Sequence, residues 1–246
     1  MSHALIVGGT RGLGRAVTRI LAARGDRVSV FGRREPPQAD MRIQNAKHWI
    51  VDLCDDSAAQ RAVESVIDDR GPLHYLIFCQ RYRGQGDDWA GEIQVSLTAT
   101  KRLIDTLAPK FAPEDDKGIV LVSSVFGDWV GDGQPLSYHV GKAGMNHLAR
   151  FYAVNLGPKG IRVNTVTPFT FLKEESQDFY INNRELHALY EEMIPLKRMG
   201  TADDSASAVA FLCSPAASFI NGHNLYVDGG LSLVWPETLA RRLKSI

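Results

Sequence analysis

The feature that most constrains the fold lies at the start of the chain, where a short apolar run breaks into glycines. Residues 4–7 are too few for a helix and predict a buried strand, and the glycine-rich residues 8–14 follow directly. Apolar residues then recur at helical spacing until Gly25 ends the run. This order predicts a phosphate-binding loop, because glycines let a pyrophosphate approach the backbone and a helix start offers free N–H groups. A glycine-rich turn without a ligand is the alternative.

Short apolar runs alternate with helical patterns along the rest of the chain. The predicted strands are residues 27–31, 49–51, 73–79, 119–122, 161–166 and 224–227, with helical patterns at 57–69, 93–107 and from Tyr138 onward. This alternation predicts an α/β fold, a Rossmann-type doubly wound parallel sheet with helices on both faces. Ligands bind at the carboxyl ends of the strands in such folds. The glycine loop, Asp52, Cys79 and Ser124 all follow predicted strands, so we expect them at one edge of the sheet.

Composition narrows the class of protein. The 246 residues show no repeat or linker-like shift, so we expect a single domain over residues 1–246. Lys and Arg balance Asp and Glu at 28 each, which does not support binding to nucleic acid or to a membrane surface. No run is long enough to span a membrane, and no signal peptide is evident. The cysteines lack metal-ligand spacing, so we expect a cytoplasmic protein with reduced thiols and no metal.

The end of the second predicted strand indicates which dinucleotide would bind. An acidic residue at this position holds the ribose 2′-hydroxyl of NAD, whereas arginine suits the 2′-phosphate of NADP. Here Gly32 takes the acidic position and Arg33 and Arg34 follow, with Arg11 in the glycine loop as a second possible clamp. The pattern favours NADP(H). A solvated basic turn is the alternative.

Ser124, Tyr138 and Lys142 form a candidate catalytic set. A loop rich in glycine separates Ser124 from Tyr138, which opens an apolar-periodic run. In a helix Tyr138 and Lys142 lie four residues apart on one face. An ammonium close to a phenol favours the phenolate, so the tyrosine could act as acid or base, while Ser124 could bind a carbonyl oxygen. The spacing alone is weak, and the surrounding pattern supplies its context.

Taken together, these motifs resemble the short-chain dehydrogenase/reductase (SDR) family from end to end. The resemblance also rests on Ile161-Arg162-Val163-Asn164 and Val227-Asp228-Gly229-Gly230. It implies about seven strands, a nicotinamide cofactor and hydride transfer between that cofactor and a carbonyl or alcohol. It assigns Tyr138 as the acid/base, Lys142 as the residue that assists it and binds the nicotinamide ribose, and Ser124 as the residue that orients the substrate oxygen. The implied cofactor-binding residues are Gly8, Thr10, Arg11, Gly12, Leu13, Gly14, Arg33, Arg34, Asp52, Leu53, Cys79, Tyr138, Lys142, Pro168 and Thr170.

Four positions depart from the family pattern. Val7 stands where a threonine usually precedes the first loop glycine, and Phe169 follows Pro168 where glycine is usual. The Asn-Asn-Ala-Gly that usually ends the fourth strand is replaced by residues 78–81, Phe-Cys-Gln-Arg. Ser96 aligns with the asparagine that relays protons through water, so we expect slower or altered proton delivery with Ser96 as part of the catalytic set.

Substrate choice is expected to lie in residues 169–195, which lid the pocket in the family. Packing of its aromatic residues against the core is the alternative to substrate contact. Arg81 and Arg83 follow the fourth strand, and we hypothesise that they hold an anionic or polar-tailed substrate. Analogy with relatives implies a homo-oligomer, a dimer or tetramer, with the tail of residues 231–246 contributing.

Three functions are compatible with these patterns. The leading one is an NADP(H)-dependent ketoreductase acting on a small carbonyl or alcohol. An NADP(H)-binding sensor or scaffold with little turnover is the second. A reductase or epimerase of a nucleotide-linked sugar is the third, and it is disfavoured because such enzymes usually carry a larger C-terminal substrate domain. The intact Ser124, Tyr138 and Lys142 set favours the first over the second.

Overall fold

A seven-stranded parallel sheet forms the centre of the molecule. A computed structural model describes residues 1–84 and 88–244. The strand order is β3-β2-β1-β4-β5-β6-β9, and every neighbouring pair is parallel. The strands are β1 (His3–Val7), β2 (Arg27–Gly32), β3 (Ala46–Ile50), β4 (Tyr75–Phe78), β5 (Lys117–Val122), β6 (Ile161–Pro168) and β9 (Asn224–Val227). The order reverses between β1 and β4, where a doubly wound sheet opens a ligand crevice.

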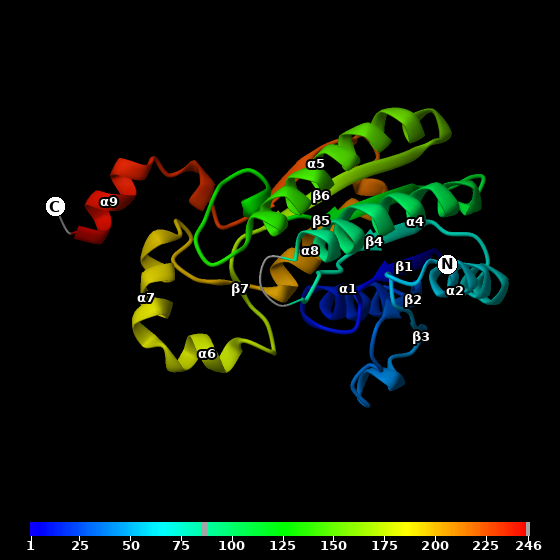
Figure 1. Cartoon of the computed structure of the whole chain (residues 1–246), viewed down its shortest axis with the longest axis horizontal. Helices are drawn as coiled ribbons and strands as arrows, with labels where there is room; N and C mark the ends of the chain where they lie inside the picture. The colour runs from blue at the N-terminus through cyan, green and yellow to red at the C-terminus, as the bar shows by residue number, and fades with distance from the viewer. Residues whose placement is uncertain (85–87, 245–246) are drawn as a thin grey trace.

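Helices cover both faces of this sheet (Figure 1). The helices of the body are α1 (Gly12–Ala23), α2 (Asp56–Arg70), α3 (Trp89–Ile93), α4 (Ala99–Leu107), α5 (Leu136–Leu156) and α8 (Ala202–Leu212). Because side chains alternate along a strand, β1 sends Leu5 and Val7 to the face covered by α2, α4 and α5, and Ala4 and Ile6 to the face covered by α1 and α8. The predicted Rossmann-type fold is confirmed.

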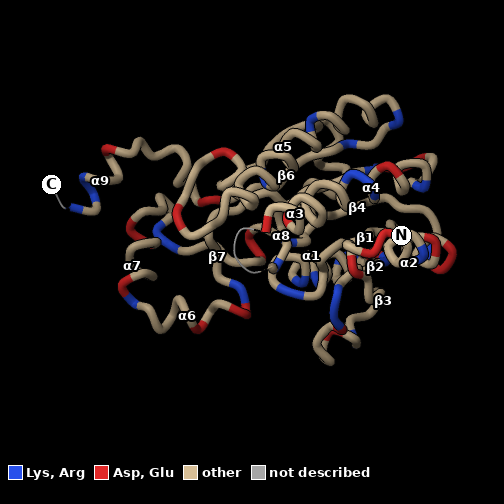
Figure 2. Tube along the Cα trace, viewed as in Figure 1, with Lys and Arg blue, Asp and Glu red and all other residues tan. Residues whose placement is uncertain are grey.

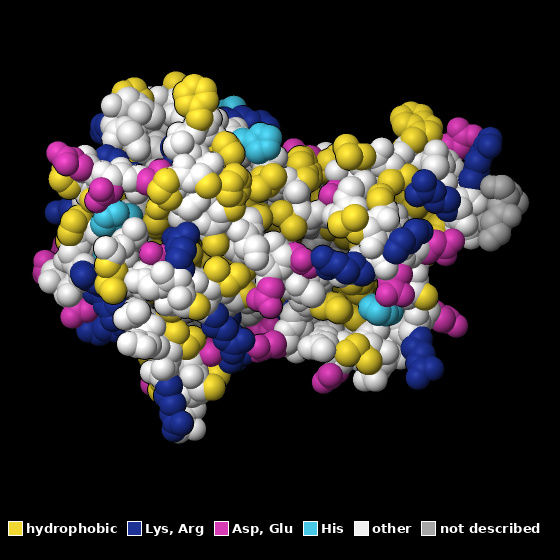
Figure 3. All heavy atoms as spheres, turned by 180° about the vertical axis from the view of Figure 1, so that it is seen from behind, with side chains coloured by type: hydrophobic (Ala, Val, Ile, Leu, Met, Phe, Trp, Pro, Cys, Tyr) yellow, Lys and Arg dark blue, Asp and Glu magenta, His cyan; other side chains and the backbone are white. Residues whose placement is uncertain are grey.

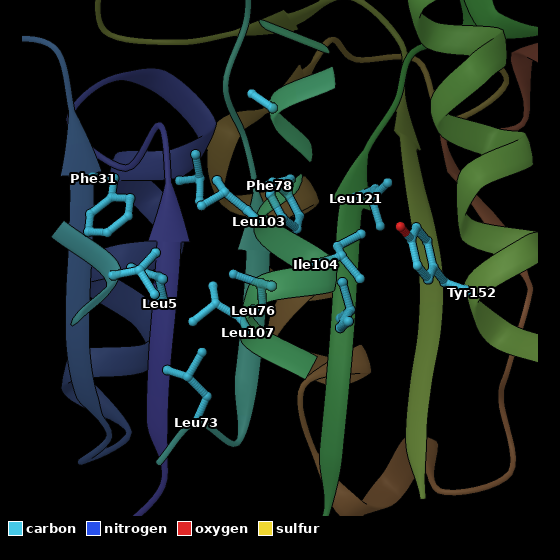
Figure 4. Packing of buried hydrophobic residues seen from close by; sticks show 14 of the residues in the cluster. Leu5, Phe31, Leu73, Leu76, Phe78, Leu103, Ile104, Leu107, Leu121 and Tyr152 are labelled. Carbon is cyan, nitrogen blue, oxygen red and sulfur yellow. The ribbon is translucent and has the colours of Figure 1, made fainter. Parts of the chain in front are cut away.

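The first of these faces shows how the core is built. Leu5, Phe31, Leu76 and Phe78 point from neighbouring strands toward α4, and Leu103, Ile104 and Leu107 of α4 meet them (Figure 4). All seven side chains are almost completely buried. The spacing of Leu103, Ile104 and Leu107 is part of the apolar period that predicted a helix over residues 93–107.

The remaining elements lie at one end of the molecule. The short strands β7 (Phe171–Leu172) and β8 (Gly200–Thr201) pair with each other. The helices α6 (Gln177–Asn182), α7 (Arg184–Met193) and α9 (Pro236–Lys244) extend beyond the sheet (Figure 1). Basic and acidic residues are interspersed along the trace (Figure 2). None of the described helices is long and apolar enough to cross a membrane.

Two predicted elements differ from the structure, and each difference has a physical cause. The helix predicted over residues 93–107 is interrupted by a π-helical turn, Gln94–Thr98, which joins α3 to α4. The third strand begins at Ala46, before the apolar triplet at 49–51, because β3 is an edge strand whose residues are exposed or only partly buried. Neither a π-turn nor a polar edge strand has an apolar period, so the pattern could not indicate them.

Candidate active site

The glycine loop joins β1 to α1, and its backbone packs too tightly for side chains. A Cβ at Gly14 would lie 2.2 Å from the carbonyl oxygen of Gly8. The first turn of α1 is therefore pressed against the end of β1, which leaves its N–H groups at the mouth of the loop. One of them, the N–H of Gly12, donates to a carboxylate oxygen of Glu175 at 3.0 Å. The loop thus holds an anion already, as expected at the positive end of a helix dipole.

The end of β2 lies close to the glycine loop. A Cβ at Gly32 would lie 2.5 Å from the side chain of Thr10, so a larger residue at this position would require the Thr10 side chain to move. Arg33 and Arg34 follow and, with Arg11, line a cleft beside the loop. Within residues 1–84 and 88–244, none of these three guanidinium groups is ion-paired. Their charge is available to an anionic ligand.

This cleft, which we call the glycine-loop cleft, has a volume of about 360 Å³. It lies over the carboxyl ends of β1, β2 and β4, where the strand order reverses. The predicted cofactor-binding residues that line it are Gly8, Thr10, Arg11, Arg33, Arg34, Asp52, Leu53 and Cys79. Residues distant in sequence therefore line one cleft, although Ser124, expected at the same edge of the sheet, is not among its lining residues.

Tyr138 and Lys142 lie on the same face of α5. The Lys142 ammonium is 5.7 Å from the centre of the Tyr138 ring, and Lys142 is 4% exposed. The ammonium also donates to the carbonyl of Val122, the last residue of β5, at 2.8 Å. This bond fixes a buried charge against the end of the sheet. A phenol held beside a fixed ammonium is suited to donating and accepting a proton.

Ser124 belongs to the turn that packs against the start of α5. Its hydroxyl oxygen accepts the N–H of Phe126 at 3.3 Å, which leaves the hydroxyl proton able to bond a ligand oxygen. The ring of Phe126 contacts Tyr138 edge to face at 6.5 Å, and Ser123 donates to the carbonyl of Lys142 at 3.2 Å. The turn that carries Ser124 is thereby attached to both catalytic candidates on α5.

The π-helical turn places Ser96 in the interior of the protein, facing α5. Ser96 is fully buried, and its hydroxyl donates to the carboxylate of Glu92, itself 3% exposed. A Cβ at Gly141 would lie 3.1 Å from that carboxylate, so Glu92 is packed against α5 at the residue before Lys142. Sequence reasoning did not single out Glu92, because a glutamate in a helical pattern normally indicates a solvated face.

Residues 78–81, which replace the usual Asn-Asn-Ala-Gly, still attach the end of β4 to the neighbouring helix α4. Gln80 is buried and donates to the Thr100 hydroxyl at 2.8 Å, so it ties this loop to α4. Burial raises the pKa of the neighbouring Cys79 thiol to about 12, and the Lys142 ammonium works in the opposite direction. Cys79 therefore stays protonated near neutral pH, so it is not a candidate for the acid/base.

Not every predicted site residue lines the glycine-loop cleft. The catalytic candidates Ser96, Ser124, Tyr138 and Lys142 are not among its lining residues, and Arg81, which is, contacts the Tyr138 ring. Gly12, Leu13 and Gly14 lie at the start of α1, adjoining the loop. Pro168 ends β6 next to β9, and Thr170 lines a separate cavity of about 110 Å³ between β9 and α8. A shallow hollow of about 650 Å³ between α6 and α7 contains none of the predicted site residues.

The segment 169–195 is attached to α1 by charged residues. Glu174 forms ion pairs with Arg15 and Arg19, the latter at 3.0 Å, and Glu175 takes the N–H of Gly12. Its aromatic residues contact one another instead of the glycine-loop cleft, with Tyr190 5.8 Å from Phe169 and 5.9 Å from Tyr180. The alternative, packing against the core, applies to Phe171, which packs against the buried cluster beneath α1 and α8. In the part of the chain that the structure describes, no group of three or more His, Cys, Asp or Glu residues could hold a metal ion.

A doubly wound sheet with a glycine loop at its switch point defines a Rossmann-type protein. The chain belongs to the short-chain dehydrogenase/reductase family of oxidoreductases, since the family profile described as Enoyl-(Acyl carrier protein) reductase matches residues 7–232. This family uses nicotinamide cofactors.

Known proteins similar to this chain are matched over nearly their full length. A tropinone reductase homologue of Arabidopsis thaliana is 32% identical over 244 residues, covering 94% of this chain and 90% of that protein. The 3-oxoacyl-[acyl-carrier-protein] reductase FabG of Escherichia coli is 27% identical, covering 94% and 97%. A gluconate 5-dehydrogenase of Burkholderia cenocepacia, solved with NADP and tartrate, is 23% identical with a TM-score of 0.83, covering 95% and 96%, and shares the fold.

Proposed function

We propose that this protein is an NADP(H)-dependent oxidoreductase that transfers a hydride between the cofactor and a carbonyl or secondary alcohol, with ketone reduction as its main reaction. The observation that carries the proposal is the pairing of the Lys142 ammonium with the Tyr138 ring. Arg81, which lines the glycine-loop cleft, contacts the same ring and links the pair to the cleft. A protein that only binds a dinucleotide has no need for a buried ammonium next to a phenol.

In the proposed reaction NADPH, when bound, supplies the hydride to the carbonyl carbon. Tyr138 donates its phenolic proton to the oxygen of the carbonyl, so that no free alkoxide forms. Lys142, held by the carbonyl of Val122, keeps positive charge beside the resulting phenolate. Ser124 holds the same substrate oxygen with its free hydroxyl proton. We include Ser96 as the group that carries protons toward Lys142 in place of the usual asparagine.

Two features support NADP(H) over NAD(H). Gly32 takes the position of the acidic residue that would bind a 2′-hydroxyl. Arg11, Arg33 and Arg34 line the cleft without an ion-pair partner in the described part of the chain, and each can bind a phosphate through paired N–H groups. The glycine loop suits the pyrophosphate that both cofactors share, since the N–H of Gly12 already binds a carboxylate.

The remaining expectations complete the proposal. Residues 1–246 act as one domain, with 169–195 as the segment over the substrate. Exposed apolar residues support a homo-oligomer, among them Phe151 at 56% and Val154 at 76% on α5, and Trp235 at 69% before α9. Hydrophobic side chains are exposed at several places on the back of the molecule (Figure 3).

The three cysteines are free, in keeping with a reducing cytoplasm.

The test is NADPH oxidation with a panel of ketones, using Tyr138→Phe. We expect this variant to lose about 10²–10⁴-fold in kcat while NADPH binding is retained, because only the proton donor is removed. The matched control is Tyr152→Phe on the same helix, whose hydroxyl bonds Asp105 at 2.6 Å. Equal turnover by Tyr138→Phe and the parent protein would refute the acid role. NADPH binding with no turnover of any ketone would instead favour the sensor or scaffold.

A further inference from the structure

An arginine stands directly over the proposed acid/base. The guanidinium carbon of Arg81 lies 4.9 Å from the centre of the Tyr138 ring. One N–H of Arg81 donates to the side-chain oxygen of Gln134 at 2.7 Å. Gln134 belongs to the loop that runs from Ser124 to Tyr138, so Arg81 contacts both the phenol and this loop. The Gln134 amide is neutral, so it does not compensate the positive charge of Arg81.

Two further cations lie in the same region: Arg83 lines the glycine-loop cleft, and the Lys173 side chain lies against Gly12 of the glycine loop. Burial lowers the pKa of Lys173, and the neighbouring positive charges of Arg81 and Arg83 lower it further. The three residues come from two segments, the end of β4 and the start of the 169–195 segment. None of them is ion-paired within residues 1–84 and 88–244, although the carboxylate of Glu175 is near Lys173. Within the described part of the chain, no ion pair offsets the repulsion among these like charges, and a bound anion would relieve it.

The cofactor and the substrate are the two ligands that could bring this anion. Arg83 and Arg81 line the glycine-loop cleft, so a cofactor phosphate is one candidate. The cofactor phosphates already have their own groups, the N–H of Gly12 and the arginines after β2. Arg81 differs from these because its contacts are the Tyr138 ring and Gln134, where the reacting carbonyl would bind.

We propose that Arg81, assisted by Lys173, binds an anionic group of the substrate, which makes the substrate class a carbonyl compound bearing a carboxylate or phosphate. The inference rests on the proposed function and adds to it the chemistry of the substrate. Arg81 is exposed and reachable by a ligand, and its planar guanidinium can bind a carboxylate through two hydrogen bonds. Lys173 supplies a second positive charge from the opposite segment.

The experiment compares matched acids and esters. The probes are 4-oxopentanoate and 5-oxohexanoate, each with its methyl ester, and the quantity measured is the ratio of kcat/KM for the acid to that for the ester. We expect the parent protein to favour the acid of at least one pair by about tenfold or more, the worth of one charge-assisted pair of hydrogen bonds. Arg81→Gln should bring the ratio close to one. Arg61→Gln, an exposed arginine on α2, is the control and should leave it unchanged.

Three results would overturn the proposal. The parent protein could reduce or bind both acids no better than their esters. Arg81→Gln could lower kcat/KM for acid and ester equally, which is a structural effect. Arg81→Gln could also raise the Kd for NADPH without changing the acid-to-ester ratio. That result would mean that these cations bind the cofactor and not the substrate.

A binding measurement separates this inference from the proposed function. The NADP⁺-saturated protein is titrated with the same acids and esters, and the parent should bind the acid about tenfold more tightly, with Arg81→Gln losing the difference. Acid-selective binding without any ketone reduction would refute the reaction and sustain the anion site. Reduction of the esters, abolished in Tyr138→Phe but without acid preference, would sustain the reaction and refute the anion site.

Discussion

The glycine-loop region and the 169–195 segment meet at Gly12, and they are held in place by different forces. In the first, backbone touches backbone: Gly14 and Gly8 are so close that no side chain fits between them. In the second, charges add to strand pairing and packing, since Glu174 and Glu175 attach the segment to α1 through Arg15, Arg19 and the N–H of Gly12. Steric contacts are insensitive to ligands, whereas a carboxylate on a helix N-terminus can be displaced by another anion. The first region is therefore suited to hold a cofactor and the second to move when one binds.

Gly14→Ala breaks the steric side of this comparison and should have the largest effect. Its Cβ would lie 2.2 Å from a carbonyl oxygen, so the loop or α1 must shift. We expect a loss of about 3 kcal/mol in the free energy of unfolding, measured by urea denaturation, together with loss of NADPH binding. The control is Gly200→Ala, whose Cβ would meet its nearest neighbour at 3.7 Å. Parental stability and NADPH affinity in Gly14→Ala would show that the loop is not sterically determined.

Arg33→Ala tests whether the rigid region also selects the cofactor. Removing one charge-assisted clamp on a 2′-phosphate should raise the Kd for NADPH by about 10- to 100-fold and leave the Kd for NADH nearly unchanged. Both constants can be measured by fluorescence titration, with Arg61→Ala as the control. An equal effect on the two cofactors would reject the phosphate clamp at Arg33.

His3, at the amino end of β1 and opposite the glycine loop, makes the sheet sensitive to acid. Burial lowers the pKa of His3 to about 4, and the ring is bonded to Ser29 and to the carbonyl of Gly71 at 2.9 Å. A histidine pKa below its unfolded value of 6.5 means that the unfolded chain binds the proton first. Stability is therefore lost as the pH falls from about 6.5 to 4.

Urea unfolding at several pH values measures this effect. We expect the parent to lose about 2 kcal/mol between pH 7 and pH 4.5 from His3, and His3→Asn to show a correspondingly flatter profile. His223→Asn, at an exposed histidine, should keep the parental slope. The same slope in His3→Asn and the parent would assign the acid sensitivity to other groups.

Glu175→Gln tests the charged side of the comparison and should have the smallest effect. Removing the carboxylate from the N–H of Gly12 removes an internal competitor for the pyrophosphate, so NADPH should bind about 3- to 10-fold more tightly. Glu192→Gln on α7, also exposed, is the control. Weaker NADPH binding in Glu175→Gln would mean that this carboxylate supports the cofactor site instead of competing with it.

Prediction from the sequence succeeded where a short stretch carries its own physical signal. The glycine loop, the strand ends and the pairing of Tyr138 with Lys142 follow from periodicity and from residues within one or two turns of each other. The contact between Gly12 and Glu175 joins residues 163 positions apart, and no local pattern encodes it. The burial of Glu92 and the contact of Arg81 with Tyr138 are of the same kind.

The sequence by itself determined the order of strands and helices, the position of the phosphate loop and the identity of the candidate acid/base, because hydrophobic period and glycine spacing act over a few residues. The tertiary structure alone decided that Glu175 occupies the start of α1, that Arg81 lies over the Tyr138 ring, and that Thr170 faces another cavity. These contacts depend on how distant segments pack, and packing is a property of the whole chain.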